Sequence, residues 1–307
     1  MSDNSHTPQD RRAFLLTLGT AALAAGGASI LGCATSPSRA ADTVAGAAPL
    51  PQATGGGALL GPIGVQLYTL RDEMKRDVAA TLARVARIGY KEVEFAGYFD
   101  HSPADIRAML DADGLTAPSA HIPLNLLKSD PASVIAAART IGHSYVIMPY
   151  IDEPARRTLA DWHAMARALN EVGAEMSRAG LRLAYHNHDF EFAPIDGTVP
   201  YELLLAETDP KLVSLEMDLY WTVKAGQDPL TWFAKYPGRF PFVHVKDSRG
   251  APKHEMVEVG HGTIDWPRIL SHRAEAGIAH FVVEHDNPTD AFASIESSFT
   301  YLSRLRV

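Results

Sequence analysis

The chain has 307 residues and a formal net charge of −8 at neutral pH. That length suits one large domain or two small ones, and the hydrophobic and charged fractions are ordinary for a soluble globular protein. The acidic balance argues against a nucleic-acid-binding protein, which would need a basic face. Cys33 is the single cysteine, which excludes a disulfide framework within one chain.

Residues 1–33 have the features of an export signal. Arg11 and Arg12 precede the apolar run AFLLTLGTAALAAGGASILG, a pattern typical of the twin-arginine pathway. The run is too short and too weakly hydrophobic to be a convincing membrane-spanning helix. It ends in ILGC, which is similar to a bacterial lipobox, so Cys33 is the expected lipid anchor. We expect a periplasmic lipoprotein; the alternative is a plain signal cleaved near residues 38–40.

Residues 34–60 are predicted to form a flexible tether, because they are small, rich in proline and glycine, and poor in charge. The segment GGGALLG lacks the G-x-G-x-x-G spacing and has no strand before it, and the chain has no Walker-type loop. The sequence therefore offers no nucleotide-binding loop.

From Gly61 onward, amphipathic helical stretches alternate with short apolar stretches. In the first helical stretch, Val78, Leu82, Val85 and Ile88 fall on one face. A glycine follows five of the helical stretches, as expected for helix ends: Gly89, Gly114, Gly142, Gly180 and Gly277. The eight candidate strands are 63–69, 91–96, 116–121, 144–149, 182–187, 212–218, 241–247 and 280–285.

This alternation predicts a parallel sheet covered by helices. Eight strand–helix units in residues 61–307 match the size of a closed (β/α)₈ barrel, the TIM barrel. A doubly wound open sheet is the alternative fold.

Polar residues gather at the carboxyl ends of the candidate strands. They are Gln66, Tyr68, Glu94, His121, His186, His188, Glu216, Asp218, His244, Lys246, Glu284 and His285. In a (β/α)₈ barrel all these ends meet at one face, where the active site lies. His186 and His188 are two residues apart, so on an extended strand they point to the same side.

Four successive strands end in good metal ligands: His186 or His188, then Asp218, His244 and Glu284. A lone histidine at a strand end is more often a structural residue, but four ligands at matching depth form a stronger pattern. Imidazoles and carboxylates suit a divalent ion such as Mn²⁺, Zn²⁺, Co²⁺, Fe²⁺ or Mg²⁺. The sequence therefore predicts one divalent metal ion at the mouth of the barrel.

Six segments of the sequence resemble the sugar phosphate isomerase/epimerase family, the xylose isomerase-like TIM barrels. The segments are GVQLYTLRD, YHNHDFEF, LEMDLYW, FVHVKD, EVGHGTIDW and FVVEHD, and the resemblance spans about residues 61–307. The resemblance implies a divalent metal held by Glu, Asp, His and Glu on strands five to eight. On this chain the last three are Asp218, His244 and Glu284, and His186 stands in place of the first glutamate.

That departure bears on the expected reaction. In the sugar epimerases of the family, two metal-bound glutamates exchange a proton from opposite sides of the substrate. Without the first glutamate, the site has one base unless His186, His188 or Glu191 substitutes. This puts simple epimerisation in doubt and leaves room for a lyase or hydratase that acts on a keto-sugar. In either case a metal polarises the substrate carbonyl and stabilises an enediolate, and a nearby base takes the proton.

Further roles follow from position. Glu284 is the expected combined ligand and catalytic base, and His188 is the expected second acid/base. Residues expected to contact a carbohydrate substrate are Glu94, His121, Lys246 and His261. For Glu94 and Lys246 the alternative is a structural ion pair, and for His121 it is a structural role. Glu216 is expected to be a buried residue that supports the ligands.

The leading hypothesis is an exported, metal-dependent isomerase, epimerase or lyase acting on a sugar or keto-sugar derivative. A second enzyme hypothesis is a phosphodiesterase similar to endonuclease IV. It is disfavoured, because it would need more metal ligands and a basic surface, whereas the chain has a net charge of −8. A non-catalytic sugar-binding lipoprotein that kept the barrel is the alternative from another class. The substrate, the metal and the oligomeric state are left open by the sequence.

Overall fold

The structure is a computed structural model that describes residues 57–307. The predicted export signal, Cys33 and most of the predicted tether lie outside the described residues, so those predictions stay predictions. Every helix in the described part of the chain is too short or too polar to cross a bilayer.

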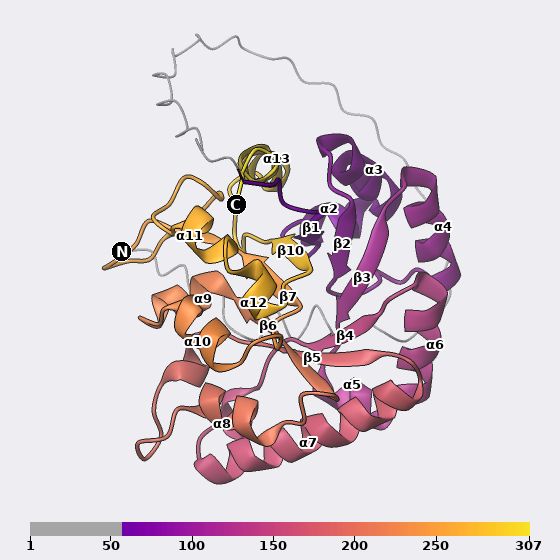
Figure 1. Ribbon diagram of the computed structural model, residues 1–307. Helices are drawn as coiled ribbons and strands as arrows, with labels where there is room; N and C mark the ends of the chain where they lie inside the picture. The colour runs from indigo at the N-terminus through magenta and orange to yellow at the C-terminus, as the bar shows by residue number, and fades with distance from the viewer. Residues whose placement is uncertain (1–56) are drawn as a thin grey trace, which may run out of the picture.

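Eight parallel strands close into a barrel in the order β1-β10-β7-β6-β5-β4-β3-β2, with helices around it (Figure 1). The strands are β1 (Ile63–Gln66), β2 (Glu92–Phe95), β3 (Thr116–His121), β4 (Tyr145–Met148), β5 (Arg182–His186), β6 (Val213–Asp218), β7 (Phe242–Val245) and β10 (His280–Val283). Each lies within a predicted strand, and β1 pairs with β10, so the barrel is confirmed and the open sheet is excluded.

The strands alternate with helices that form the outer layer. These are α2 (Arg71–Arg76), α3 (Val78–Ile88), α4 (Pro103–Asp113), α5 (Leu124–Ser129), α6 (Pro131–Ile141), α7 (Leu159–Arg178), α8 (Pro200–Glu207), α9 (Leu219–Lys224), α10 (Pro229–Lys235), α11 (Trp266–Leu270), α12 (Arg273–Ala276) and α13 (Ala291–Leu302). Short 3₁₀ helices are η1 (Glu153–Ala155) and η2 (Phe190–Phe192), and a small antiparallel pair is formed by β8 (Asp247–Ser248) and β9 (Met256–Val257).

Helix α3 shows how the local sequence sets these elements. The Asp77 side chain accepts a hydrogen bond from the backbone N–H of Ala80 and so caps the first turn. Val78, Leu82 and Val85 are buried against the barrel, as the apolar stripe predicts. After α4, Gly114 has φ 64°, a left-handed conformation that glycine adopts without strain, and the chain turns into β3.

The inside of the barrel has an apolar layer and a polar layer. The apolar layer is a separate cluster of Tyr145, Ile147, Ala184, Phe242 and Val282. Because side chains on one face of a strand recur every second residue, the next inward positions toward the carboxyl ends include His186, His244 and Glu284. The polar layer therefore lies at the carboxyl end of the barrel, on an apolar floor.

The two described ends of the chain meet. The backbone N–H of Val307 donates to the carbonyl of Ala58 at 3.0 Å, and Leu59 forms an isolated bridge with Arg306. The last residues of the predicted tether are thus paired with the C-terminal end of the domain.

Candidate metal centre

Neighbouring strands place the predicted ligands side by side. In the register of the barrel, His186 of β5 is opposite Glu216 of β6, and Asp218 of β6 is opposite His244 of β7. Glu284 follows β10 directly. All five side chains are buried, at 2% exposure or less. The burial of so many ionisable groups is costly unless they are paired or bind a metal.

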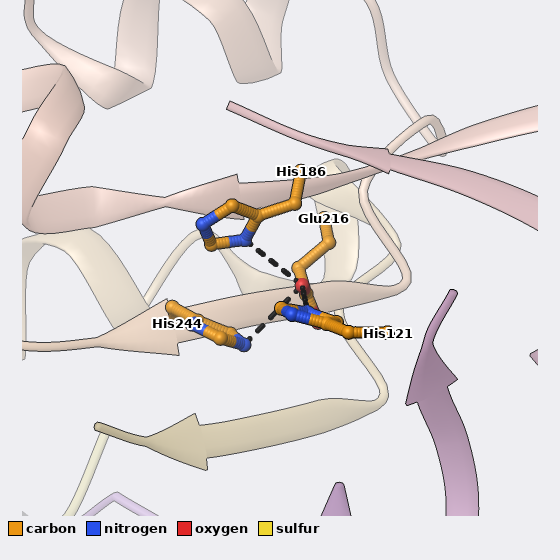
Figure 2. Close-up of side chains that lie close together, drawn as sticks. All are labelled: His121, His186, Glu216 and His244. Carbon is orange, nitrogen blue, oxygen red and sulfur yellow. Dashed lines mark hydrogen bonds and ion pairs between the residues drawn. The ribbon is translucent and has the colours of Figure 1, made fainter. Parts of the chain in front are cut away.

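One carboxylate oxygen of Glu216 contacts three imidazole rings. Its Oε2 lies 2.8 Å from His121 Nε2, 2.9 Å from His186 Nδ1 and 3.2 Å from His244 Nε2. Figure 2 shows the three rings converging on this carboxylate. Glu216 is therefore buried, as the sequence predicted, and it contacts two of the predicted ligands, His186 and His244.

Glu94 and His121 form the next part of this buried network. Glu94 accepts hydrogen bonds from Gln66 Nε2 at 2.7 Å and Ser119 Oγ at 2.6 Å, and His121 Nε2 lies 2.9 Å from its Oε1. Burial alone would raise the pKa of Glu94, but His121 and His244 hold it well below its usual range. Burial opposes protonation of His121, yet Glu94 and Glu216 raise its pKa to about 9.

Glu94 and His121 are thus paired with protein groups at the base of the site. Their predicted contact with substrate stays a prediction.

His186 is oriented like a metal ligand. Burial, with nearby His244, holds the pKa of His186 well below its usual range, so the ring is neutral and has a single N–H. Its Nδ1 is next to Glu216, and its buried Nε2 has no hydrogen-bond partner. That Nε2 lies 3.7 Å from Asp218 Oδ2. Two buried electron-pair donors that face each other across this distance fit a shared metal ion.

Asp218, His244 and Glu284 form a second group, in which one ligand atom from each lies within 4.8 Å of the others. His244 Nδ1 lies 2.9 Å from Glu284 Oε2. Burial would lower the pKa of His244, but Glu216, Glu284 and Glu94 raise it well above its ordinary value. A metal ion on Nδ1 would replace the proton that this nitrogen shares with Glu284.

The residues present therefore fit a divalent ion. His186 Nε2 and Asp218 Oδ2 face each other, and Asp218 and Glu284 each have an oxygen beside His244. Imidazole nitrogens and carboxylate oxygens suit Zn²⁺, Mn²⁺, Fe²⁺ and Co²⁺. The buried cluster agrees with the predicted divalent-metal site.

Lys246 follows β7 and is also fully buried. Its Nζ lies 2.8 Å from Asp218 Oδ2, 2.5 Å from Glu284 Oε2 and 3.1 Å from Asp286 Oδ1. These contacts agree with the alternative interpretation of Lys246 as an ion-pair partner, and two of its three partners, Asp218 and Glu284, are predicted metal ligands.

His188 lies beside the ligands among aromatic rings. Its ring centroid is 5.0 Å from that of His186 and 5.4 Å from that of Trp221. Glu191 does not join the cluster: its Oε1 accepts a hydrogen bond from Tyr185 Oη at 2.5 Å, and its Oε2 accepts one from the His188 backbone N–H at 2.8 Å. Burial raises the pKa of Glu191 to about 8. His188 is thus the group nearer to the predicted ligands.

His261 lies at the surface, next to α13. Its exposed side chain lies 3.1 Å, from Nε2 to Oγ, from Ser297 of α13. The loop that carries it is held by the Asp247 carboxylate, which accepts hydrogen bonds from the backbone N–H groups of Gly260 and Gly262. The predicted contact of His261 with substrate stays a prediction.

Two residues of the site were missed from the sequence. Ser119 donates to Glu94, and Asp286 is an ion-pair partner of Lys246. Each is two residues from a predicted site residue, His121 or Glu284, so the two-residue period of a strand was the available signal.

The sequence matches the protein family described as xylose isomerase-like TIM barrel over residues 82–305. The chain belongs to this family. A sugar phosphate isomerase/epimerase from Parabacteroides distasonis has the same fold, with a TM-score of 0.70 and 26% identity, over 83% of this chain and 98% of that chain. The resemblance inferred from the sequence motifs is thereby confirmed.

Two further relatives bear on the chemistry. An inosose dehydratase from Lacticaseibacillus casei is 28% identical over 232 residues, which cover 64% of this chain and 77% of that protein. The structure of an IOLI protein with a bound zinc atom superposes with a TM-score of 0.63 at 17% identity, over 78% of this chain and 96% of that chain, which is a likeness of fold. This member of the xylose isomerase-like family is a sugar isomerase/epimerase-like enzyme.

Proposed function

We propose that this enzyme is a divalent-metal-dependent lyase or dehydratase acting on a keto-sugar or a related polyhydroxylated ketone. One observation carries the proposal. The resemblance in the sequence puts His186 at the position of the family's first glutamate ligand, and in the structure Glu284 is the carboxylate grouped with His244 and Asp218, which makes it our candidate for the base. Relatives named inosose dehydratase support it, since an inosose is a cyclic polyhydroxylated ketone.

The proposed metal ligands are His186 Nε2, Asp218, His244 Nδ1 and Glu284. A bound divalent ion would supply positive charge that stabilises an oxyanion on the substrate carbonyl. Glu284 is well placed for a double role, because its Oε2 is already beside His244 and Lys246.

In the proposed reaction, Glu284 takes the proton from the carbon next to the carbonyl, and the electron pair of that C–H bond forms an enediolate. The enediolate then re-forms the carbonyl. Its C=C electron pair shifts to make a double bond between the carbon next to the carbonyl and the following carbon, while the C–O bond of that following carbon breaks. His188 gives its proton to the departing oxygen, which leaves as water or an alcohol. His188 lies beside His186 at the aromatic rim formed with Tyr150, Phe190 and Trp221.

Simple epimerisation would need a second base that returns the proton from the opposite side of the same carbon. Elimination needs one base and one acid, which Glu284 and His188 supply. This difference separates the proposed lyase from the isomerase and epimerase hypotheses of the sequence.

Metal content is the first test. Plasma mass spectrometry on the purified full chain should find close to one equivalent of a divalent metal, and His186→Ala and Asp218→Ala should each lose it. His163→Ala is the matched control, because His163 pairs with Glu207 on the surface of α7. Loss in Asp218→Ala alone would remove His186 from the ligand set. If the wild-type protein contains no metal even after incubation with Mn²⁺ or Zn²⁺, the proposal is wrong.

The reaction type is tested by incubating keto-sugars with the metal-loaded enzyme in D₂O and following the products by NMR. We expect an unsaturated product and release of the β-oxygen group. A product that keeps all its oxygens and carries deuterium at the carbon next to the carbonyl would instead establish an epimerase or isomerase.

A further inference from the structure

Lys246 has a position that is unusual for a lysine, because its side chain is fully buried in the polar layer of the barrel. A buried ammonium is strongly destabilising unless it is paired. Lys246 meets that condition through three carboxylates, Asp218 at 2.8 Å, Glu284 at 2.5 Å and Asp286 at 3.1 Å.

Two of these carboxylates, Asp218 and Glu284, belong to the set of four proposed metal ligands. The ammonium is in contact with Asp218 Oδ2, the oxygen that faces His186 Nε2, and with Glu284 Oε2, the oxygen beside His244. A divalent ion bound to these oxygens would lie within a few ångströms of the ammonium, where repulsion between like charges is strong.

We infer that Lys246 is the counter-ion of the metal-free site and that the incoming metal must displace its ammonium from Asp218 and Glu284. This inference rests on the metal-binding part of the proposed function. In the metal-free protein Lys246 compensates the charge of the ligands and keeps them together. The same contacts weaken metal binding, because the metal ion can bind the Asp218 and Glu284 oxygens only after their ion pairs with the Lys246 ammonium break.

Asp286 is the alternative ion-pair partner for the displaced ammonium of Lys246. It is two residues beyond Glu284, its side chain is partly exposed at 16%, and it already contacts the same ammonium. The lysine can therefore stay paired with Asp286 when the ligand oxygens are taken, so displacement does not leave a buried charge alone.

The test compares Mn²⁺ affinity in wild type, Lys246→Met and Lys246→Gln by isothermal titration calorimetry. Both substitutions remove the competing charge, so each should bind Mn²⁺ at least about tenfold more tightly, while the metal-free variants unfold at a lower temperature than the metal-free wild type. Lys235→Met is the control, because Lys235 pairs with Glu202 on the surface. Equal or weaker binding by the folded variants would overturn the inference.

A second measurement on the wild-type protein covers the case in which the variants fail to fold. Amine labelling with acetic anhydride, read out by mass spectrometry, should modify Lys246 faster when Mn²⁺ is bound, relative to Lys235. Unchanged or slower labelling of Lys246 with Mn²⁺ bound would overturn the inference.

The two proposals fail in different ways. If neither wild type nor the Lys246 variants bind metal, the proposed metal site is wrong and the inference is overturned with it. If wild type binds metal and the substitutions leave its affinity unchanged, only the role of Lys246 is wrong.

Discussion

His186 Nδ1 and Glu216 Oε2 lie 2.9 Å apart, on neighbouring strands whose register pairs these two residues. Because the His186 ring is neutral and has one N–H, this contact fixes the proton on Nδ1. Nε2, which faces Asp218, then carries a lone pair. Glu216 thereby decides which nitrogen of the histidine is available to a metal.

The first prediction concerns this control. Glu216→Gln should weaken binding of Mn²⁺ or Zn²⁺ by about 10- to 100-fold, because the amide no longer fixes the tautomers of His186 and His244. Calorimetric titration of the metal-free protein measures the effect. Glu202→Gln, a change at a surface ion pair, should leave the affinity as it is. If the two variants bind metal equally well, the tautomer argument fails.

A second prediction separates the two steps of the proposed reaction. Glu284→Gln should slow exchange of the hydrogen next to the carbonyl by about 10²- to 10⁴-fold, because the amide is not a base. His188→Gln should keep that exchange and lose release of the β-oxygen group. Both are followed by NMR in D₂O at saturating metal. Loss of exchange in His188→Gln with retention in Glu284→Gln would reverse the assigned roles.

The third prediction concerns the protonation of His143, a buried histidine outside the predicted ligand set. His143 Nδ1 is 2.7 Å from the Ala117 carbonyl and its Nε2 is 3.0 Å from Tyr98 Oη. Burial lowers the pKa of His143 to about 4 from an ordinary value of 6.5. As pH falls through this window the unfolded chain binds a proton that the folded protein does not. The folded state therefore loses up to about 3 kcal/mol, whereas above pH 6.5 the full stability is present.

Urea unfolding of the metal-free protein at pH 7, 6 and 5 measures this dependence. His143→Gln should be less stable at pH 7 and should lose part of the decline toward pH 5. Parallel pH profiles for the variant and the wild type would show that His143 does not titrate in this window.

A fourth prediction concerns the loop after β7. The buried Asp247 carboxylate accepts hydrogen bonds from the backbone N–H groups of Gly260, Gly262 and Ile264 and from Trp266 Nε1, at 2.9–3.2 Å. Asp247→Ala should lower the free energy of unfolding by about 3–5 kcal/mol, because buried donors lose their acceptor. Asp247→Asn should lower the free energy of unfolding by less than Asp247→Ala does, because the amide oxygen can still accept hydrogen bonds. A loss below about 1 kcal/mol for Asp247→Ala, measured by urea unfolding, would contradict this account.

The barrel was predictable because hydrophobic pattern and glycine positions carry most of the information about it. Each strand, such as β5 or β6, lies inside its predicted range, and the same alternation placed His186, Glu216 and Asp218 on the inward face. The gathering of strand ends at one face then follows from the closed topology.

Contacts across the barrel were harder to predict. The period of a strand says which side chains share a face, but the stagger between strands sets their depth. This is why the joining of Glu94 to His244, 150 positions apart in sequence, was not foreseen. The contact of His261 with Ser297 was unpredictable for another reason: it depends on the loop held by Asp247, and loop conformation leaves no periodic signal.

The pairing of Ala58 with Val307 fixes where the preceding chain leaves the domain. Residue 58 precedes β1, and Val307 follows α13, which runs back along the barrel, so this pairing lies at the amino-terminal end of the strands. The predicted metal ligands are at the opposite end of the barrel. Residue 57 therefore joins the domain at the floor of the barrel, and the mouth with the predicted ligands faces away from this junction.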